Sequence, residues 1–254
     1  GVAGAAEATV ISQYVSGMGI TIYALLKSTH FRIKLKHLKF DMNIVKELAN
    51  FSILTALQQS VMNFGILLVQ GLVNSFGTVV MAAFAAAVKI DTLAYSPVQD
   101  FGNAVSTFVA QNYGAGKHRR IKDGWKQSMI AASVFCVCVS AVVFIFAEKF
   151  MGLFLSDGTE IIKVGAEYLR IEGSFYIGIG ILFLLYGFYR AVGKPEMSLI
   201  LTIISLGTRV VLAYALSAIS KIGVIGIWIS VPIGWFLADM TGLLYMKKLP
   251  LLKS

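Results

Sequence analysis

Apolar runs long enough to cross a bilayer follow one another along almost the whole of this chain. They occupy residues 2–26, 48–73, 79–112, 127–149, 171–190, 197–219 and 223–246. A helix needs about 20 apolar residues to span the hydrocarbon core of a membrane. The sequence therefore predicts an all-α integral membrane protein with seven transmembrane helices.

The composition supports a lipid environment and argues against nucleic acid as a partner. Hydrophobic residues make up 57% of the chain and charged residues only 14%, whereas a soluble domain is about half apolar and a quarter charged. The net charge of +9 would suggest nucleic acid only if the basic residues formed a surface on a soluble domain. Here they punctuate the apolar runs, so the lipid bilayer is the expected surrounding.

The third run is too long for one straight crossing and contains charged residues and a proline. We expect residues 79–90 to form an outer-surface segment, and the remainder to form a span kinked near Pro97. The short polar segment at residues 156–170 is expected to be an interfacial helix that leads into the next span.

The basic residues predict the orientation. If seven helices alternate across the membrane, 16 of the 22 Lys and Arg residues fall on one side, in the loops at 27–47, 113–126 and 190–196 and in the tail from 247, and 4 fall on the other. Cytoplasmic loops are enriched in Lys and Arg. The chain is thus predicted to be a multi-pass cell-membrane protein with Gly1 outside and the C-terminus in the cytoplasm.

Residues 27–47 form the longest predicted cytoplasmic connection and alternate basic with apolar side chains. Such a segment is expected to lie on anionic headgroups as an amphipathic linker. A site for a calmodulin-like partner is the alternative.

Ionisable residues inside spans suggest function because burying a charge in the membrane is costly. Asp100 and Arg209 are expected near mid-membrane, where they either pair across the bundle as a structural lock or contribute to a cavity in which Asp100 binds a proton or cation. Lys89 and Asp91 are expected near the outer edge, in water or neutralised by neighbours. Asp239 is expected near the cytoplasmic interface, as a snorkelling side chain or in a local ion pair.

Polar residues in the second run share one helical face. Gln59, Asn63 and Gln70 follow i, i+4 and i+11 spacing. They predict either hydrogen bonds between helices or a polar stripe along a substrate path.

Neither an enzyme nor a metal site is predicted. The histidines lie in basic loops without a second ligand at helical spacing, and Cys136 and Cys138 point about 200° apart on a helix. An enzyme in a membrane would need clustered acids, histidines or metal ligands at one depth, and the sequence offers none.

The third run ends in a polar, glycine-containing stretch, Gln111-Asn112-Tyr113-Gly114-Ala115-Gly116-Lys117. Gly114 and Gly116 are expected to adopt the left-handed conformation that closes a helix, and the basic residues that follow face the negative end of its dipole. This stretch is therefore predicted to cap the helix at the cytoplasmic surface.

The ends of the chain suggest an internal repeat. Gly1-Val2-Ala3-Gly4 and Gly223-Val224-Ile225-Gly226 each open a span, and they are 222 residues apart with six spans between their starts. Parallel repeats of this kind are typical of transporters. The pattern predicts the last helix of one six-helix unit followed by a complete second unit.

An ordered set of motifs resembles the multidrug and toxic compound extrusion (MATE) family of antiporters. It comprises Phe108-Val109-Ala110-Gln111-Asn112-Tyr113-Gly114-Ala115-Gly116-Lys117, Tyr168-Leu169-Arg170, Gly187-Phe188-Tyr189-Arg190-Ala191-Val192-Gly193-Lys194 and Arg209, together with the two Gly-Val-x-Gly starts. The resemblance covers the whole chain in the expected order. It gives structural roles to Gln111, Asn112, Gly114, Gly116, Arg190 and Gly193.

The resemblance implies a twelve-helix protein with two lobes around a central cavity. Residues 1–26 would be the last helix of the N-terminal lobe, 27–47 a cytoplasmic linker, and 48–254 the C-terminal six-helix lobe. The missing N-terminal lobe and a small organic substrate would be the partners. The implied activity is export of amphipathic, cationic compounds driven by Na⁺ or H⁺, without a cofactor.

The sequence departs from the family pattern at the acids of the coupling-ion site. The acids at which some family members bind a coupling ion would lie within the spans at 48–73 and 171–190. No acid lies between Glu47 and Gln70 or between Glu172 and Tyr189, so no such ligand carries over.

The alternative function is that of a flippase for a lipid-linked or polysaccharide precursor. A flippase would be expected to carry more cations toward its cavity than Arg209.

Overall fold

The computed structural model describes residues 2–27, 41–155 and 158–249, and the regular structure within these ranges is entirely helical. The helices are α1 (Val2–Lys27), α2 (Met42–Asn74), α3 (Thr78–Gly114), α4 (His118–Phe154), α5 (Thr159–Gly173), α6 (Tyr176–Ala191), α7 (Pro195–Ser217) and α8 (Ile225–Met246). Six of them are long and apolar enough to cross a membrane, and the bent pair α5–α6 brings the number to as many as seven. The prediction of an all-α fold is confirmed.

The chain divides into two units, residues 1–49 and 50–254. In the first unit, the described side chains of α1 are exposed almost throughout, including Ile11, Tyr14 and Leu26. A single apolar helix has no core of its own in which to bury such side chains, as expected of a membrane span. Most of the predicted linker, residues 28–40, lies outside the described residues.

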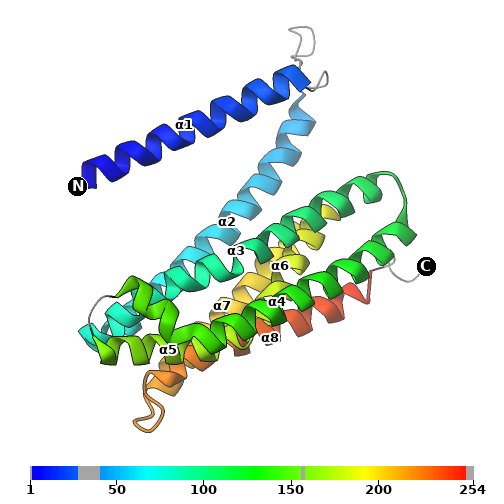
Figure 1. Ribbon diagram of the computed structural model, residues 1–254. Helices are drawn as coiled ribbons and strands as arrows, with labels where there is room; N and C mark the ends of the chain where they lie inside the picture. The colour runs from blue at the N-terminus through cyan, green and yellow to red at the C-terminus, as the bar shows by residue number, and fades with distance from the viewer. Residues whose placement is uncertain (1, 28–40, 156–157, 250–254) are drawn as a thin grey trace. The chain divides into compact units, whose positions relative to one another are not determined.

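In the second unit the helices run lengthwise beside one another, and their connections gather at two ends (Figure 1). The turns between α3 and α4 and between α6 and α7 share one end with the last residues of α8. The connections α2–α3 and α7–α8 lie at the opposite end, together with the last residues of α4 and the first residues of α5. The basic connections are thus together, as alternating spans require.

Helix α6 is the centre of this unit, because its residues are buried from Leu184 to Tyr189 without a break. It approaches α3 closely through glycines. A Cβ added to Gly187 would lie 2.2 Å from the carbonyl oxygen of Gly102, and one added to Gly102 would lie 2.6 Å from that of Phe183. Small residues of this kind let membrane helices pack backbone to backbone.

Two apolar clusters form the core. Around the first, Phe84 stacks on Trp228 with ring centroids 5.4 Å apart, and Tyr168 meets Trp228 edge to face at 4.9 Å. The second contains the fully buried Leu184, Leu185 and Leu201. These contacts join α3, α5 and α8 in one cluster and α6 and α7 in the other.

The expected outer-surface segment at 79–90 is wrong. Helix α3 runs unbroken from Thr78 to Gly114 with Pro97 inside it, and Ala83, Phe84 and Ala87 are buried within the first two to three turns. Phe84 and Ala87 contribute to the first apolar cluster, so packing extends the helix where hydropathy alone suggested a surface segment.

The predicted interfacial helix at 156–170 is present as α5, but it packs into the bundle. Tyr168 and Leu169 on α5 are almost fully buried. Helix α6 has only 16 residues, fewer than the about 20 that a span needs, and α5 meets it at a bend of 53°. The fifth predicted run therefore contains the end of α5 and nearly all of α6, on either side of a bend, and is not one straight helix.

Two connections close in the same way. Gly116 has φ 66° and the Lys117 amide donates to the Asn112 carbonyl at 2.8 Å, while Gly193 has φ 74° and the Lys194 amide donates to the Tyr189 carbonyl at 2.9 Å. This is the Schellman pattern with glycine in the left-handed region. The expectation is confirmed for Gly116 and wrong for Gly114, which is the last residue of α3 and is not among the positive-φ glycines.

Candidate functional site

Helix α3 exposes a continuous row of polar side chains, which we call the polar face of α3. Its members are Lys89, Thr92, Ser96, Gln99, Asp100, Asn103, Thr107 and Gln111, all of them exposed. Apart from the adjacent Gln99 and Asp100, the members follow one another in steps of three and four residues, which places them on one side of a helix. The row extends along most of a helix that is long enough to span a membrane.

The exposed surfaces of the neighbouring helices are chemically different. Along the middle of α4 they are apolar, with Ile130, Val134, Val137, Val142 and Ile145 exposed. The large hydrophobic side chains that α8 exposes include Phe236, Met240 and Leu244. Lipid satisfies such surfaces but cannot satisfy hydroxyl and amide groups. The polar face of α3 is thus suited to water or to another polar surface.

The structure places Asp100 on this face and Arg209 elsewhere. Asp100 is exposed, whereas Arg209 is half-buried on α7. The ion pair that the described residues contain joins Arg170 to Glu148 at 2.9 Å, and none joins Asp100 to Arg209. The proposed lock between these two residues is therefore wrong.

The predicted stripe on α2 is only partly engaged within the second unit. Gln59 and Asn63 are exposed, and Gln70 donates to Asn74 of its own helix at 3.0 Å. The hydrogen bond to another helix is made instead by Gln58, which donates to the hydroxyl of Thr202 on α7 at 3.1 Å. The one-face spacing of these residues is compatible with a polar path, which stays a prediction.

Of the motif residues, Asn112 and Arg190 stabilise helix ends. The Asn112 side chain is buried and donates to the Phe108 carbonyl at 2.8 Å, and Arg190 Nε donates to the Tyr186 carbonyl at 3.2 Å. Gln111 is exposed, and its carbonyl accepts the Ala115 amide at 3.2 Å. These contacts are structural, as the motif positions suggested.

A buried polar cluster lies on the opposite side of α3, and the sequence reasoning did not find it. We call it the carboxylate cluster; its members are Asp91, Tyr168, Glu172, Tyr176 and Arg209. Asp91 is only 3% exposed. The hydroxyl of Tyr168 donates to Asp91 Oδ2 at 3.2 Å, and that of Tyr176 donates to Asp91 Oδ1. The expectation that Asp91 meets water is wrong; its neighbours satisfy it.

Glu172 and Arg209 complete the cluster. Glu172 is 3% exposed, and its Oε2 has no hydrogen-bond partner among the described residues. Arg209 lies within electrostatic range of both Asp91 and Glu172. The signal for Glu172 was its i+4 spacing from Tyr168 on a short amphipathic helix, which puts both on one face. Glu172 was not recognised as a buried acid because it lies at the start of a predicted apolar run.

Asp239, like Glu172, is a buried acid with one carboxylate oxygen that has no hydrogen-bond partner among the described residues. It is 6% exposed on α8, and its Oδ1 has no hydrogen-bond partner among the residues the structure describes. It neither reaches the surface nor forms an ion pair within those residues. Both expectations for this side chain are wrong.

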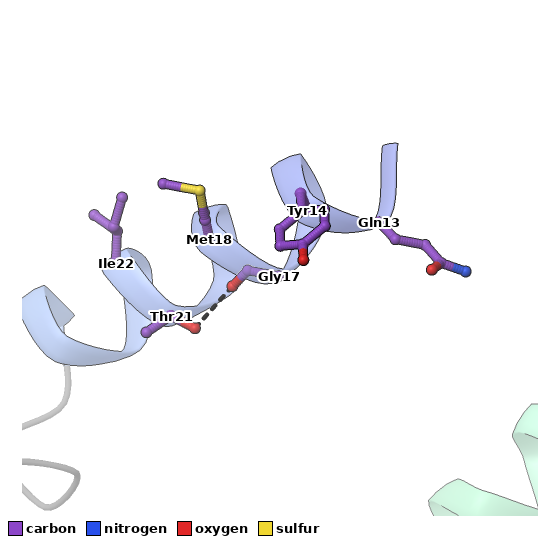
Figure 2. A pocket seen from close by; sticks show the side chains of 6 residues that line it. All are labelled: Gln13, Tyr14, Gly17, Met18, Thr21 and Ile22. Carbon is purple, nitrogen blue, oxygen red and sulfur yellow. Dashed lines mark hydrogen bonds between the residues drawn. The ribbon is translucent and has the colours of Figure 1, made fainter. Parts of the chain in front are cut away.

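Surface grooves add little to the site. One lies along α1 and is lined by Gln13, Tyr14, Gly17, Met18, Thr21 and Ile22. Figure 2 shows that all six side chains belong to this one helix, where the Thr21 hydroxyl donates to the Gly17 carbonyl at 2.7 Å. Among the described residues no group of three or more His, Cys, Asp or Glu could hold a metal ion.

Several helices long and apolar enough to cross a membrane, together with a polar face and buried ionisable groups, define a protein of the helical membrane class. The sequence profile of the MatE family matches residues 53–215. The chain belongs to this family, which confirms the resemblance seen in its motifs.

Among curated relatives, the chain is 27% identical over 230 residues to the probable multidrug resistance protein NorM of Thermotoga maritima, covering 90% of this chain and 49% of that protein. It is also 27% identical over 255 residues to the probable multidrug resistance protein YpnP of Bacillus subtilis, covering 97% and 55%. The chain thus spans about half the length of the relatives it matches.

Solved structures agree on the fold. An outward-facing multidrug resistance MATE family transporter of the MOP superfamily matches with a TM-score of 0.89 at 25% identity, covering 97% of this chain and 56% of that one. A MOP superfamily transporter from Pyrococcus furiosus matches the fold with a TM-score of 0.89 at 24% identity.

Proposed function

We propose that this chain is the C-terminal half of a secondary antiporter that exports small amphipathic, cationic organic compounds. The observation that carries the proposal is the polar face of α3, a row of hydroxyl, amide and carboxylate groups exposed on a largely apolar bundle. A second six-helix lobe, preceding this one in the complete transporter, would cover that face and enclose a wet cavity. The names of the relatives support drug export.

In this proposal the residues of the polar face contact the substrate, and no covalent chemistry takes place. Gln99 and Asn103 offer hydrogen bonds, and Asp100 offers a negative charge to a cation. A Na⁺ or H⁺ gradient drives alternating access by shifting the population between outward-open and inward-open states. The basic connections face the cytoplasm and Gly1 lies outside, as the distribution of Lys and Arg favours.

Flippase activity is the second candidate, and the polar face argues against it. A phosphate-bearing lipid precursor would be bound by cationic side chains. Lys89 is the only cation in the row defined above, and Arg209 lies in the buried cluster instead. A cationic substrate fits better.

The proposal is tested by dye export from an efflux-deficient host that expresses the complete transporter. We expect resistance to cationic dyes, and dye movement in inverted vesicles that collapses with the ion gradient. Absence of both, in cells where the protein reaches the membrane, would rule the proposal out. Movement of a lipid-linked precursor but no dye would favour the flippase.

Single changes on the polar face should weaken transport without affecting folding. We expect Asn103→Leu and Asp100→Asn each to lower the rate of dye export about tenfold, which corresponds to about 1.4 kcal/mol, since each removes one polar contact to substrate. Val137→Leu on the exposed apolar surface of α4 is the matched control and should leave export unchanged. Loss of membrane-inserted protein in the Asp100 variant would instead indicate a structural role.

A further inference from the structure

The charges of the carboxylate cluster do not balance. Asp91 and Glu172 supply two acids, and among the residues that the structure describes Arg209 is the only cation within electrostatic range of both. The first apolar cluster, with Phe84 and Trp228, surrounds this region. An unbalanced charge in an apolar interior is costly, so such sites neutralise the excess.

The hydrogen bonds indicate which acid stays ionised. Both oxygens of Asp91 accept phenolic hydroxyls, one from Tyr168 and one from Tyr176. An ionised carboxylate can only accept hydrogen bonds, and this arrangement offers it two donors. Asp91 is therefore the acid whose ionised form the hydrogen bonds of the cluster stabilise.

Glu172 is influenced by the charge of Arg209 and by the Tyr168 hydroxyl, but one of its two carboxylate oxygens has no donor among the described residues. Its Oε2 is buried and has no hydrogen-bond partner among the described residues. A carboxylate oxygen in this state is destabilised, whereas protonation removes the charge and turns the group into a donor. Arg209 and Tyr95 are only half-buried, so the cluster lies close to the surface on the side of α3 and α7.

Within the described part of the chain, the elements packed around the cluster add no second cation to this balance. The titratable or charged groups that face the cluster are Tyr95 on α3, Tyr168 and Glu172 on α5, Tyr176 on α6 and Arg209 on α7. Helix α8 contributes the indole of Trp228, and α4 contributes Val143 against Gly173 and, further along, the Cys136 thiol against Gly180. Sodium is the poorer occupant, because the phenolic hydrogens already engage Asp91 and the described residues lack a third acidic ligand.

We propose that the carboxylate cluster binds one exchangeable proton, and that Glu172 carries it. The proton comes from water, forms an O–H bond on the Glu172 carboxylate and returns to water when that bond breaks, while Asp91 keeps its hydrogen bonds from Tyr168 and Tyr176. This makes the cluster a proton site of the C-terminal lobe. The role of that proton in export rests on the proposed function; its binding does not.

Proton binding can be measured directly by infrared spectroscopy of the complete transporter in nanodiscs, without any substrate. We expect the wild type to show the C=O stretch of a protonated carboxylic acid, with loss of one carboxyl band as the pH is raised. Glu172→Gln should lack this band. Glu167→Gln, at an exposed glutamate on the same helix, is the matched control and should retain it.

Three results would overturn the assignment. They are an unchanged band in Glu172→Gln, the absence of any titrating buried carboxyl in the wild type, and abolition of the band by Na⁺ at constant pH. Should Glu172→Gln fail to fold, Tyr168→Phe replaces it; removing a hydroxyl from the cluster should shift the frequency of the same band, and an unshifted band would count against the assignment.

A transport measurement separates the two proposals. In proton-gradient-driven dye export, Glu172→Gln should lose at least tenfold of the gradient dependence while dye binding is retained, and Glu167→Gln should match the wild type. If the wild type exports no dye but the infrared band titrates, the proposed function fails and the proton site stands. If dye is exported and Glu172→Gln behaves as the wild type in both measurements, the proton site is refuted.

Discussion

Replacing Gly187 with alanine should destabilise the second unit more than any other single methyl group added to α6. The new Cβ would lie 2.2 Å from the Gly102 carbonyl oxygen, and backbone cannot move aside as a flexible side chain can. Overpacking of this kind costs about 1–3 kcal/mol. We expect a lower melting temperature and less folded protein by fluorescence-detected size-exclusion chromatography.

The control for this prediction is Gly207→Ala on α7, where an added Cβ meets nothing within 4 Å. Alanine is the better helix former, so this variant should be as stable as the wild type or more stable. Equal stability of the Gly187 and Gly207 variants would show that α3 and α6 are not in close backbone contact.

Arg209→Gln should cause the second large loss. It leaves Asp91 and Glu172 as two acids in an apolar interior without their cation, and removing one partner from buried charges costs on the order of 3 kcal/mol. We expect a several-fold drop in folded protein. The double variant Arg209→Gln with Asp91→Asn removes one charge of each sign and should recover most of that loss.

Arg170→Gln is the matched control for the arginine prediction. Arg170 pairs with Glu148 at 2.9 Å, but the two side chains are 40% and 59% exposed, and exposed ion pairs contribute little. Its stability should stay within about 0.5 kcal/mol of the wild type. A double variant no more stable than Arg209→Gln alone would mean that the arginine acts through packing rather than charge.

The sequence predicted the helices well because the bilayer imposes one simple requirement, an apolar run of sufficient length. It failed where tertiary packing overrides local hydropathy. Phe84 and Ala87 pack into the core and make the start of α3 part of the bundle. The 53° break between α5 and α6 falls at Ser174 and Phe175, where no proline marks it and the Gly173-Ser174 pair is the local signal.

The candidate site was predicted less completely. Asp100 was identified because a charged residue within an apolar run can be recognised from the sequence alone. The carboxylate cluster was not identified, because Asp91, Glu172 and Arg209 come from three helices separated in sequence. Hydropathy indicates how deep a residue lies in the membrane but not which neighbouring helix its side chain faces. Only the fold shows that Arg209 lies near Asp91 and not near Asp100.

The hydrogen bonds that Asp91 accepts depend on the angle between α5 and α6. Tyr168 precedes the bend and Tyr176 follows it, yet both hydroxyls reach the same carboxylate. In a straight helix, residues eight apart are separated by about 12 Å along the axis and point in different directions. If α5 and α6 straightened into one helix, at least one of these hydroxyls would move away from Asp91. The two hydrogen bonds to Asp91 therefore hold α5 and α6 at their present angle.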